Sequence, residues 1–499
     1  MEQTVSTTPY VQPSKRIGRI DFLASSLFVL VLASLVGITA CADPGGVSLG
    51  DSRLLYVANL LAIALLMLIA ARSMRPTRAT PVPLLHPPML MTAWFLFVIA
   101  IPGLALFTYP ANLLALRLPP DDYYAYLAPG MTLCLAGLTA LWIGYSLGLT
   151  AIQPARVLRF LGDRSPSLLA ILALYTLTIA VRLARIMVTG IAFGADSTHL
   201  GPLLPFDQWL KYIEDSRYLI LAVTASQIFG RRWPWPVLVL MVTMEILYAF
   251  TSGFMKPLLW VIVVLLLSLV YRGFNLKRCI PYLVPTVLIA ITIVPVAQEL
   301  RLSFRQFDSR SPVQVWNATQ EAFGSTWGKG IGIGWAAFTQ KSLLRQTEVA
   351  QMPAVILMTT PSVIPFEGFQ QFAAIPAYVI PRAVWPDKPV LSRGIWFGIT
   401  YLNNPTTTTT SRAMTIFGES YIFGGWLGTI LASLCLGLLL ALLVRSSVGI
   451  GLTSVYIALV PTFIDVESQL TVMTVTLIQG LAIYLFLYYV LTIRLRRSL

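Results

Sequence analysis

The stretch SYIFGGWLGTILASLCLGLLLALLV, residues 420–444, contains no charged residue. A helix that crosses the hydrocarbon core of a bilayer needs about 20 predominantly apolar residues. Backbone N–H and C=O groups in lipid must be paired within the protein, which favours helices over barrel strands for runs of this length. The stretch therefore predicts a membrane-spanning α-helix.

Comparable apolar runs recur along all 499 residues, of which 57% are hydrophobic and only 11% are charged. Together with a mean hydropathy of +0.76, they predict an all-α polytopic membrane protein with about 12 transmembrane helices. The expected spans are 22–40, 54–71, 89–108, 127–148, 167–190, 214–230, 236–252, 257–271, 280–299, 420–444, 449–464 and 472–490.

The net charge of +14 is unevenly distributed between the loops. About half of the 35 basic residues lie before the first span, after the last span and in every second loop between them, as Arg75, Arg159, Arg278 and Arg445 do. Short cytoplasmic loops carry such an excess of Lys and Arg. The pattern therefore predicts that both termini are cytoplasmic, and it accounts for most of the excess charge without a nucleic-acid partner.

This topology divides the chain into three parts. Helices 1–9 form a membrane bundle over residues 1–299, a large external loop between helices 9 and 10 covers 300–415, and helices 10–12 occupy 416–499. The prolines of the loop exclude one long helix and predict re-entrant or irregular structure.

Two stretches of the external loop allow two interpretations each. Trp316, Phe323 and Trp327 share a helical stripe, which predicts a helix lying on the membrane, or alternatively a platform of aromatic rings for sugars. The segment NNPTTTTTSRAM, residues 403–414, is either a flexible linker or the rim of a site for a hydroxyl-rich ligand.

Cationic side chains gather on the expected outer side. Arg182 and Arg185 share one side of the fifth span, Lys256 lies at an outer hairpin, and Arg301 and Arg305 are one helical turn apart. An arginine at the bilayer centre costs about 2.5–3.5 kcal/mol on insertion scales. Guanidinium groups bind diphosphates with bidentate, charge-assisted bonds, so the cluster favours a diphosphate ligand over the alternative of snorkelling to the headgroups.

A carboxylate and two glycines mark the start of the tenth span. Glu419 lies near the mouth of the bundle, where it needs a partner: it forms an ion pair with Arg412 or Arg382, or it accepts a proton. Gly424 and Gly428 have the small-xxx-small spacing that lets helices approach closely.

No metal site, cofactor or nucleophilic triad is predicted. The two histidines, His86 and His199, have no Cys or His companion at ligand spacing. The four cysteines form no disulfide framework.

Three strings in order carry a resemblance: SGFMKPLLW (252–260), IPRAVWPDKP (380–389) and RAMTIFGESYIFGGWLG (412–428). In a twelve-span protein with one large external loop, they resemble the Wzy-type polysaccharide polymerases over roughly residues 170–445. The chain departs from the paired Arg-x10-Gly loops of some members, because Arg382 reaches Gly394 one residue beyond that spacing.

The resemblance implies a GT-C-like glycosyltransferase of the bacterial inner membrane. Such an enzyme joins O-antigen or exopolysaccharide repeat units carried on undecaprenyl diphosphate at the periplasmic face, without a metal. The implied partners are polyprenyl-diphosphate-linked oligosaccharide donor and acceptor, membrane lipids, and chain-length regulator and flippase proteins.

Candidate roles follow from combining the resemblance with the charge pattern. Arg382 would stabilise the departing diphosphate, and Glu419, in preference to Glu367, would accept the proton of the attacking hydroxyl. The expected substrate-binding cations are Arg301, Arg305, Lys388, Arg412, Arg182, Arg185 and Lys256.

Other activities remain open at this point. A lipid-linked sugar flippase or another transporter also fits twelve spans and a cationic interior, although no internal repeat is visible. A glycan ligase is chemically close. A metal-dependent GT-C transferase using Asp43 and Asp51 is disfavoured, because CADPGGVSLGD (41–51) lacks paired acids.

Overall fold

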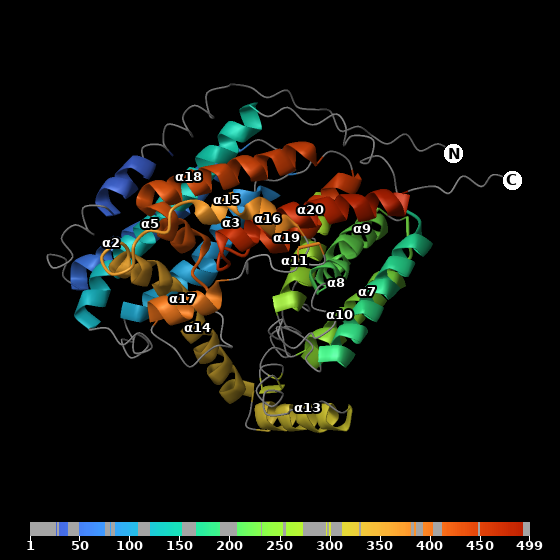
Figure 1. Ribbon diagram of the computed structural model, residues 1–499. Coiled ribbons are helices and arrows are strands. Elements are labelled where there is room, and N and C mark those ends of the chain that lie inside the picture. Colours follow the sequence, from blue (N-terminus) through green and yellow to red (C-terminus); the bar gives the residue numbers. More distant parts are fainter. Residues whose placement is uncertain are drawn as a thin grey trace.

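The computed structural model describes most of the helical part of the chain (Figure 1). The described residues are 29–37, 49–74, 85–107, 120–151, 166–189, 207–230, 232–252, 256–272, 312–328, 331–380, 393–402, 412–447 and 450–492, with a few isolated positions. Over these ranges the chain forms helices and no strand, so the predicted all-α class is confirmed.

The helices of the first half are α2 (Leu49–Ser73), α3 (Pro87–Trp94), η3 (Phe95–Ala100), α4 (Ile101–Gly103), η4 (Leu104–Phe107), α5 (Pro120–Ala151), α7 (Leu168–Thr189), α8 (Asp207–Asp215), α9 (Arg217–Phe229), α10 (Trp235–Ser252) and α11 (Lys256–Tyr271). The second half contains α13 (Pro312–Trp327), α14 (Ile331–Thr359), α15 (Gln370–Ala373), α16 (Ile375–Val379), α17 (Gly394–Leu402), α18 (Ile416–Ser446), α19 (Ile450–Phe463) and α20 (Leu470–Thr492).

Five stretches of helix are long and apolar enough to cross a membrane: Gly50–Ser73, Pro87–Phe107, Tyr124–Ala151, Ile416–Ser446 and Leu470–Thr492. All five coincide with expected spans, and they are the helices of a membrane protein. Shorter apolar helices cover four further expected spans: Leu168–Ala184, Trp235–Ala249, Lys256–Tyr271 and Gly451–Phe463. Most of the expected spans 22–40 and 280–299 lies outside the described residues, so the number twelve stays a prediction.

The sixth expected span, 214–230, is divided between two helices. α8 ends at Asp215 and α9 begins at Arg217, with Ser216 between them. Every side chain of α9 from Arg217 to Gln227 is buried. This span is therefore an interior helix with a charged start rather than a lipid-facing one.

α5 and α18 cross at the centre of the bundle. A Cβ atom at Gly144 of α5 would lie 2.1 Å from the carbonyl oxygen of Leu434, and one at Gly437 of α18 would lie 2.2 Å from that of Leu141. Side chains larger than hydrogen would push the two helices apart at both points, so these glycines permit the close approach that small residues give in membranes.

Gly424 does not serve this purpose, which corrects the prediction from its spacing to Gly428. Gly424 (φ −166°, ψ 32°) and Gly425 (φ 62°, ψ −149°) interrupt α18 with non-helical backbone. A Cβ atom at Gly428 would approach the carbonyl of Ser420 in the same helix, at 2.7 Å. The two glycines of the pattern therefore permit a break within α18, and the helix that follows it, 426–446, is roughly 30 Å long.

The loop segment 300–415 contributes a long helix to the bundle. α14 is 29 residues long, and its second half packs against α5, where a Cβ atom at Gly130 would lie 2.8 Å from the backbone nitrogen of Ala354. Val355 and Ile356 are fully buried there. Lys341, Arg345 and Glu348 interrupt the apolar pattern of α14, so the sequence alone did not predict that its second half packs in the bundle.

α13 lies apart from the main bundle, beyond the far end of α14 (Figure 1). The aromatic stripe is helical as expected, and Trp316 is 63% exposed and Phe323 42% exposed. The opposite face packs Ala318 and Ala322 in a small separate apolar cluster. An amphipathic helix with exposed rings agrees with the predicted position at the membrane surface, which stays a prediction.

Candidate functional site

The N-terminal ends of α18 and α20 meet at Glu419. Its fully buried carboxylate accepts a hydrogen bond from the backbone N–H of Thr471 (2.9 Å) and another from the Thr471 hydroxyl (2.7 Å). The first turn of a helix has unpaired N–H groups and a partial positive charge, which a carboxylate neutralises. Glu419 therefore caps α20 from a neighbouring helix.

An arginine–carboxylate pair lies beside this junction. Both terminal nitrogens of Arg393, at the start of α17, donate to the two carboxylate oxygens of Glu367. The Arg393 guanidinium carbon lies 3.7 Å from the ring centre of Trp396, one turn further along α17. The side chains of Arg393 and Glu367 are 12% and 25% exposed, so the pair is accessible from outside while the ring fixes the plane of the guanidinium.

The backbone of Arg393 is held by Gln469, the residue directly before α20. Its N–H donates to the side-chain oxygen of Gln469 at 3.0 Å, two residues before Thr471. Arg393 also lies within electrostatic range of Glu419. We call Glu367, Arg393, Trp396 and Gln469 the Glu367–Arg393 site.

The broken segment of α18 forms the floor next to this site. The N–H of Glu367 donates to the carbonyl of Ile422 at 3.0 Å, two residues before the break at Gly424. The rings of Phe369 and Phe366 cover Gly424 and Gly425, where added Cβ atoms would lie 3.1 and 3.2 Å from them. The loop containing Glu367 is therefore attached to the backbone of α18 beside its break.

Three further ion pairs surround the site, each joining segments expected on the outer side. Their closest nitrogen–oxygen distances are 2.8 Å for Arg412–Glu348, 2.8 Å for Lys256–Asp465 and 3.6 Å for Arg345–Glu467. The pairs bring the α10–α11 hairpin, α14 and the α19–α20 turn to one end of the bundle. This grouping agrees with the predicted alternation of loops.

Gln479 of α20 positions the chain just before the string IPRAVWPDKP (380–389), which we call the proline-rich decapeptide. Its side-chain nitrogen donates to the carbonyls of Tyr378 (3.2 Å) and Val379 (2.9 Å) at the end of α16. The hydroxyl of Tyr212 in turn donates to the side-chain oxygen of Gln479. The chain therefore enters the decapeptide from a fixed point on α20.

Arg182 belongs to a separate buried network between α7 and α10. Its guanidinium makes a bidentate pair with Glu245 at 2.9 and 3.0 Å and stacks on Tyr248, with its central carbon 4.2 Å from the ring centre. Arg217 lies 3.7 Å from Glu214 and 3.8 Å from Glu245. These four charged residues are at most 4% exposed, so the network neutralises its own charge inside the bundle.

The predicted site residues thus fall into three groups. Glu367, Glu419, Arg412 and Lys256 lie at one end of the bundle, the end expected to face outward, with the partners given above, and Arg182 lies in the buried network. Arg185 is on α7, but its side chain is outside the described residues. Also outside them are Arg301, Arg305, Arg382 and Lys388.

The expected partners of Glu419 are different from the observed ones. Arg412 pairs with Glu348 of α14, whereas Glu419 is satisfied by Thr471. Sequence reasoning did not select Arg393, Gln469 or Thr471, which lie in ordinary-looking stretches. The one available signal for Arg393 was its position directly before a glycine and an apolar turn.

The site offers a paired cation and carboxylate, an aromatic ring and a broken helix. Within the described part of the chain, no group of three or more His, Cys, Asp or Glu residues is arranged to hold a metal ion. The guanidinium fork fits a phosphate as well as it fits a carboxylate, and the adjacent Glu367 can take a proton once it is released.

Comparison with known proteins gives one family match. The profile of a domain of unknown function, DUF8712, matches residues 205–449, a segment that includes α8 to α18 and contains Glu367, Arg393 and Glu419. No curated protein and no solved structure matches the chain.

Proposed function

We propose that the protein polymerises undecaprenyl-diphosphate-linked oligosaccharide repeat units, as a twelve-span GT-C-like glycosyltransferase of the bacterial inner membrane with both termini in the cytoplasm. The observation that carries the proposal is the Glu367–Arg393 pair, at the end of the bundle that is expected to face outward. Arg393 is ordered by Trp396 and Gln469, yet its two donor nitrogens are occupied only by a side chain that a stronger anion can replace.

The diphosphate of the donor takes the two N–H donors of Arg393 that bind Glu367 in the structure. A diphosphate carries more charge than a carboxylate and accepts the same bidentate geometry. Its arrival releases Glu367 beside the sugar. Arg412 and Lys256, with the decapeptide cations Arg382 and Lys388, add to the positive potential that attracts the donor.

The reaction then needs three steps in one site. The acceptor hydroxyl attacks the anomeric carbon of the donor, and a new glycosidic C–O bond forms as the bond to the diphosphate breaks. Glu367 accepts the hydroxyl proton, and Arg393 stabilises the charge of the departing undecaprenyl diphosphate. In this assignment Glu419 positions α20 and Gln469 rather than accepting the proton.

Elongation of a lipid-diphosphate repeat unit by purified protein in nanodiscs tests the proposal. We expect products of two or more units and no loss of activity in EDTA, because the charge is stabilised by arginine. Loss of activity in EDTA that Mg²⁺ or Mn²⁺ restores would favour the metal-dependent alternative. A deletion strain should accumulate single units on the lipid carrier at the outer leaflet.

A transporter of lipid-linked sugars is the second candidate, and the break in α18 favours it. Discontinuous helices form substrate sites in many transporters. Accumulation of single repeat units on the cytoplasmic leaflet of the deletion strain would support transport and exclude polymerisation.

The expected orientation has its own test. In a variant without the native cysteines, Asn317→Cys on α13 should react with an impermeant thiol reagent in spheroplasts. Arg232→Cys, in the hairpin between α9 and α10, should not react until the membrane is opened. The reverse pattern would contradict an outer position of the Glu367–Arg393 site.

A further inference from the structure

α11 connects the two ends of the bundle. Its first residue, Lys256, pairs with Asp465 next to the candidate site. The helix is 16 residues long, which is about 24 Å, and Arg272 directly follows its last residue, Tyr271. The Tyr271 hydroxyl accepts a hydrogen bond from Thr453 in the first turn of α19, at 3.2 Å. Arg272 therefore lies where α19 begins, at the end of the bundle that is expected to face the cytoplasm.

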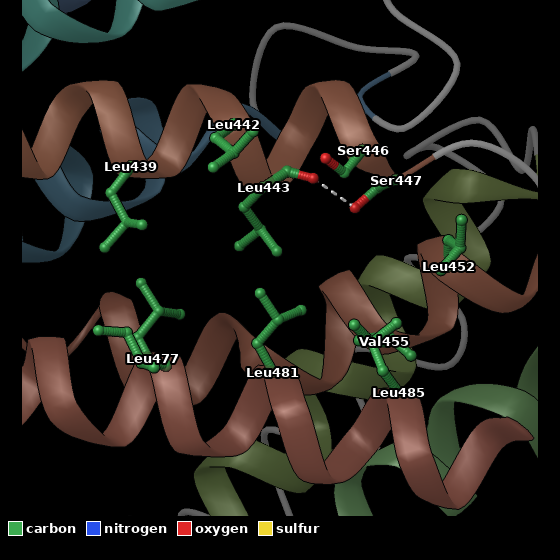
Figure 2. A pocket seen from close by; sticks show the side chains of 11 residues that line it. Leu439, Leu442, Leu443, Ser446, Ser447, Leu452, Val455, Leu477, Leu481 and Leu485 are labelled. Carbon is green, nitrogen blue, oxygen red and sulfur yellow. Dashed lines mark hydrogen bonds between the residues drawn. The ribbon is translucent and has the colours of Figure 1, made fainter. Parts of the chain in front are cut away.

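The first turns of α19 also line an apolar cavity at this end. The cavity has a volume of about 260 Å³ and lies between α18 and α20, where Leu443 and Leu481 face each other (Figure 2). Its lining in the described part of the chain is aliphatic apart from Ser446 and Ser447, and the Ser447 hydroxyl already donates to the carbonyl of Leu443 at 2.7 Å. The charged groups at this end belong instead to the ends of α9 and α11.

The guanidinium of Arg272 lies against the C-terminal end of α9. A Cβ atom at Gly230, the C-cap of α9, would lie 3.1 Å from the Nη2 atom of Arg272. This Nη2 and the Nε of the same side chain are buried and have no hydrogen-bond partner. The carbonyls at a helix C-terminus attract a cation, but here they leave both donors unpaired.

The two unpaired nitrogens form one edge of the guanidinium. The N–H groups of Nε and Nη2 are parallel, and this is the geometry with which arginine binds two oxygens of a phosphate or a carboxylate. A buried charged donor without an acceptor costs more free energy than a neutral one. The arrangement therefore favours an anionic ligand with two neighbouring oxygens.

A second arginine increases the positive potential at Arg272. Arg232 lies in the short turn between α9 and α10, where its N–H donates to the carbonyl of Gln227 at 2.9 Å. Burial lowers the pKa of the Arg272 guanidinium, and the charge of Arg232 lowers it further, against the influence of Tyr271. The fold thus holds two cations near each other, and an anion between them would relieve their repulsion.

Aromatic side chains agree with a position at the level of lipid headgroups. Trp233 and Trp235 follow Arg232 in the sequence, and Tyr271 precedes Arg272. Trp235, the first residue of α10, is 67% exposed. Trp and Tyr gather where the hydrocarbon core meets water, and basic pockets between transmembrane helices bind the headgroups of anionic lipids.

We propose that Arg272 and Arg232 bind one phosphate group at the ends of α9 and α11, with Nε and Nη2 of Arg272 donating to two of its oxygens. The headgroup of an anionic phospholipid and a free phosphate ion share this chemistry. The site lies at the opposite end of α11 from Lys256, and it does not depend on the proposed transfer reaction.

Native mass spectrometry of the intact protein tests the lipid as the source. The protein is freed of lipid in neutral detergent and incubated with phosphatidylglycerol or phosphatidylcholine, and we expect the first bound lipid to be phosphatidylglycerol. Arg272→Gln should weaken its binding about tenfold, the factor for one charge-assisted hydrogen bond, and Arg272→Lys should also weaken it because the fork is lost. Arg232→Gln should weaken it about fivefold, the factor for one cation near the headgroups.

The matched control is Arg72→Gln. Arg72 is an exposed arginine in the last turn of α2, and it is expected on the same side of the membrane. This variant removes the same charge and should bind phosphatidylglycerol as the unmodified protein does.

Inorganic phosphate tests the free ion as the source. When phosphate replaces chloride at constant ionic strength, a ligand of the folded state raises the melting temperature, and Arg272→Gln should abolish the rise. Selective retention of phosphatidylglycerol without this rise identifies a lipid site, and the rise without lipid retention identifies a site for the free ion.

The same melting experiments separate binding from a structural role. Without phosphate or anionic lipid, Arg272→Gln should melt no lower than the unmodified protein, because it removes an unpaired buried charge. Three outcomes would overturn the proposal: neither ligand binds, Arg272→Gln binds phosphatidylglycerol and phosphate as tightly as Arg72→Gln does, or Arg272→Gln melts lower without any ligand.

Discussion

The carboxylate of Glu419 on α18 is bound by both the backbone N–H and the hydroxyl of Thr471 at the start of α20. This contact joins two membrane helices at the end of the bundle where Glu367 and Arg393 lie. Because Gln469 precedes Thr471 by two residues, the position of Arg393 depends on the same helix start.

Glu419 should therefore behave as a structural residue. Glu419→Ala leaves the buried Thr471 N–H without an acceptor, at a cost of about 1–3 kcal/mol, and we expect a lower melting temperature in detergent. Glu419→Gln keeps one acceptor oxygen and should retain activity in proportion to its folded fraction. Fully folded Glu419→Gln without activity would return the role of proton acceptor to Glu419.

Arg393 and Glu367 should affect the reaction rather than the fold. Arg393→Lys keeps the charge but loses the planar fork, and Arg393→Ala removes both. Losing a preorganised charge-assisted donor costs about 10²- to 10³-fold in rate, measured as elongation of a lipid-diphosphate repeat unit.

Two further variants test whether the loss of rate is specific to the Glu367–Arg393 pair. Arg53→Ala, at an exposed arginine of α2, should leave the rate unchanged. Glu367→Gln should lower the rate without weakening binding of the donor, since it removes the proton acceptor and no diphosphate contact. Near-normal elongation by inserted Arg393→Ala protein would remove this pair from the active site.

Gly425 should tolerate no side chain. Its φ of 62° with ψ of −149° is a region occupied essentially by glycine and costs other residues of order 1–3 kcal/mol. We expect Gly425→Ala to lower the melting temperature. Gly324→Ala in α13 is the control: nothing lies within 4 Å of the added Cβ, and the alanine should stabilise that helix by about 0.5–1 kcal/mol. Equal melting temperatures for the two variants would contradict the broken α18.

Glu467 should make stability depend on pH. Burial in the α19–α20 turn raises the pKa of this carboxyl above its usual value, against the opposing influence of Lys256 and Arg345. A raised folded-state pKa gives stability that is present at low pH and is lost as the pH rises through that pKa. The melting temperature of Glu467→Gln minus that of the unmodified protein should therefore increase from pH 5 to pH 8; a constant or falling difference would contradict the shift.

The Arg182–Glu245 pair should be structural. Arg182→Met leaves Glu245 without its bidentate partner, and breaking a buried pair costs about 3–5 kcal/mol. The double variant Arg182→Met/Glu245→Met should recover most of the melting temperature. If Arg182 instead contacts substrate, the single variant will lose elongation activity with little change in stability.

The sequence was sufficient for the fold class and for most helices, because apolar runs and the distribution of charge determine where a chain crosses lipid. It was not sufficient for α14. The buried half of this helix follows Lys341, Arg345 and Glu348, which interrupt the apolar pattern, and Arg345 and Glu348 form ion pairs with Glu467 and Arg412. Hydropathy averages over both halves of such a helix and misses its apolar end.

Only part of the candidate site could be predicted from the sequence. Glu367 and Glu419 were recognised because carboxylates are rare in this chain, yet their partners depend on contacts between distant segments. Thr471 lies 52 residues from Glu419 and Gln469 lies 76 residues from Arg393. No spacing rule in one sequence connects such positions. The break at Gly424–Gly425 could not be predicted either, because the same glycine pattern is equally typical of close helix packing.

The penetration of α14 between other helices limits how the protein can be dissected. A fragment covering 300–415, produced alone as a water-soluble domain, would expose the face around Val355 and Ile356 that packs on α5 in the intact chain. We expect such a fragment to aggregate. An epitope tag or fluorescent protein inserted near Asn317, on the exposed side of α13, should be tolerated, whereas one inserted between Ala350 and Thr360 should prevent assembly.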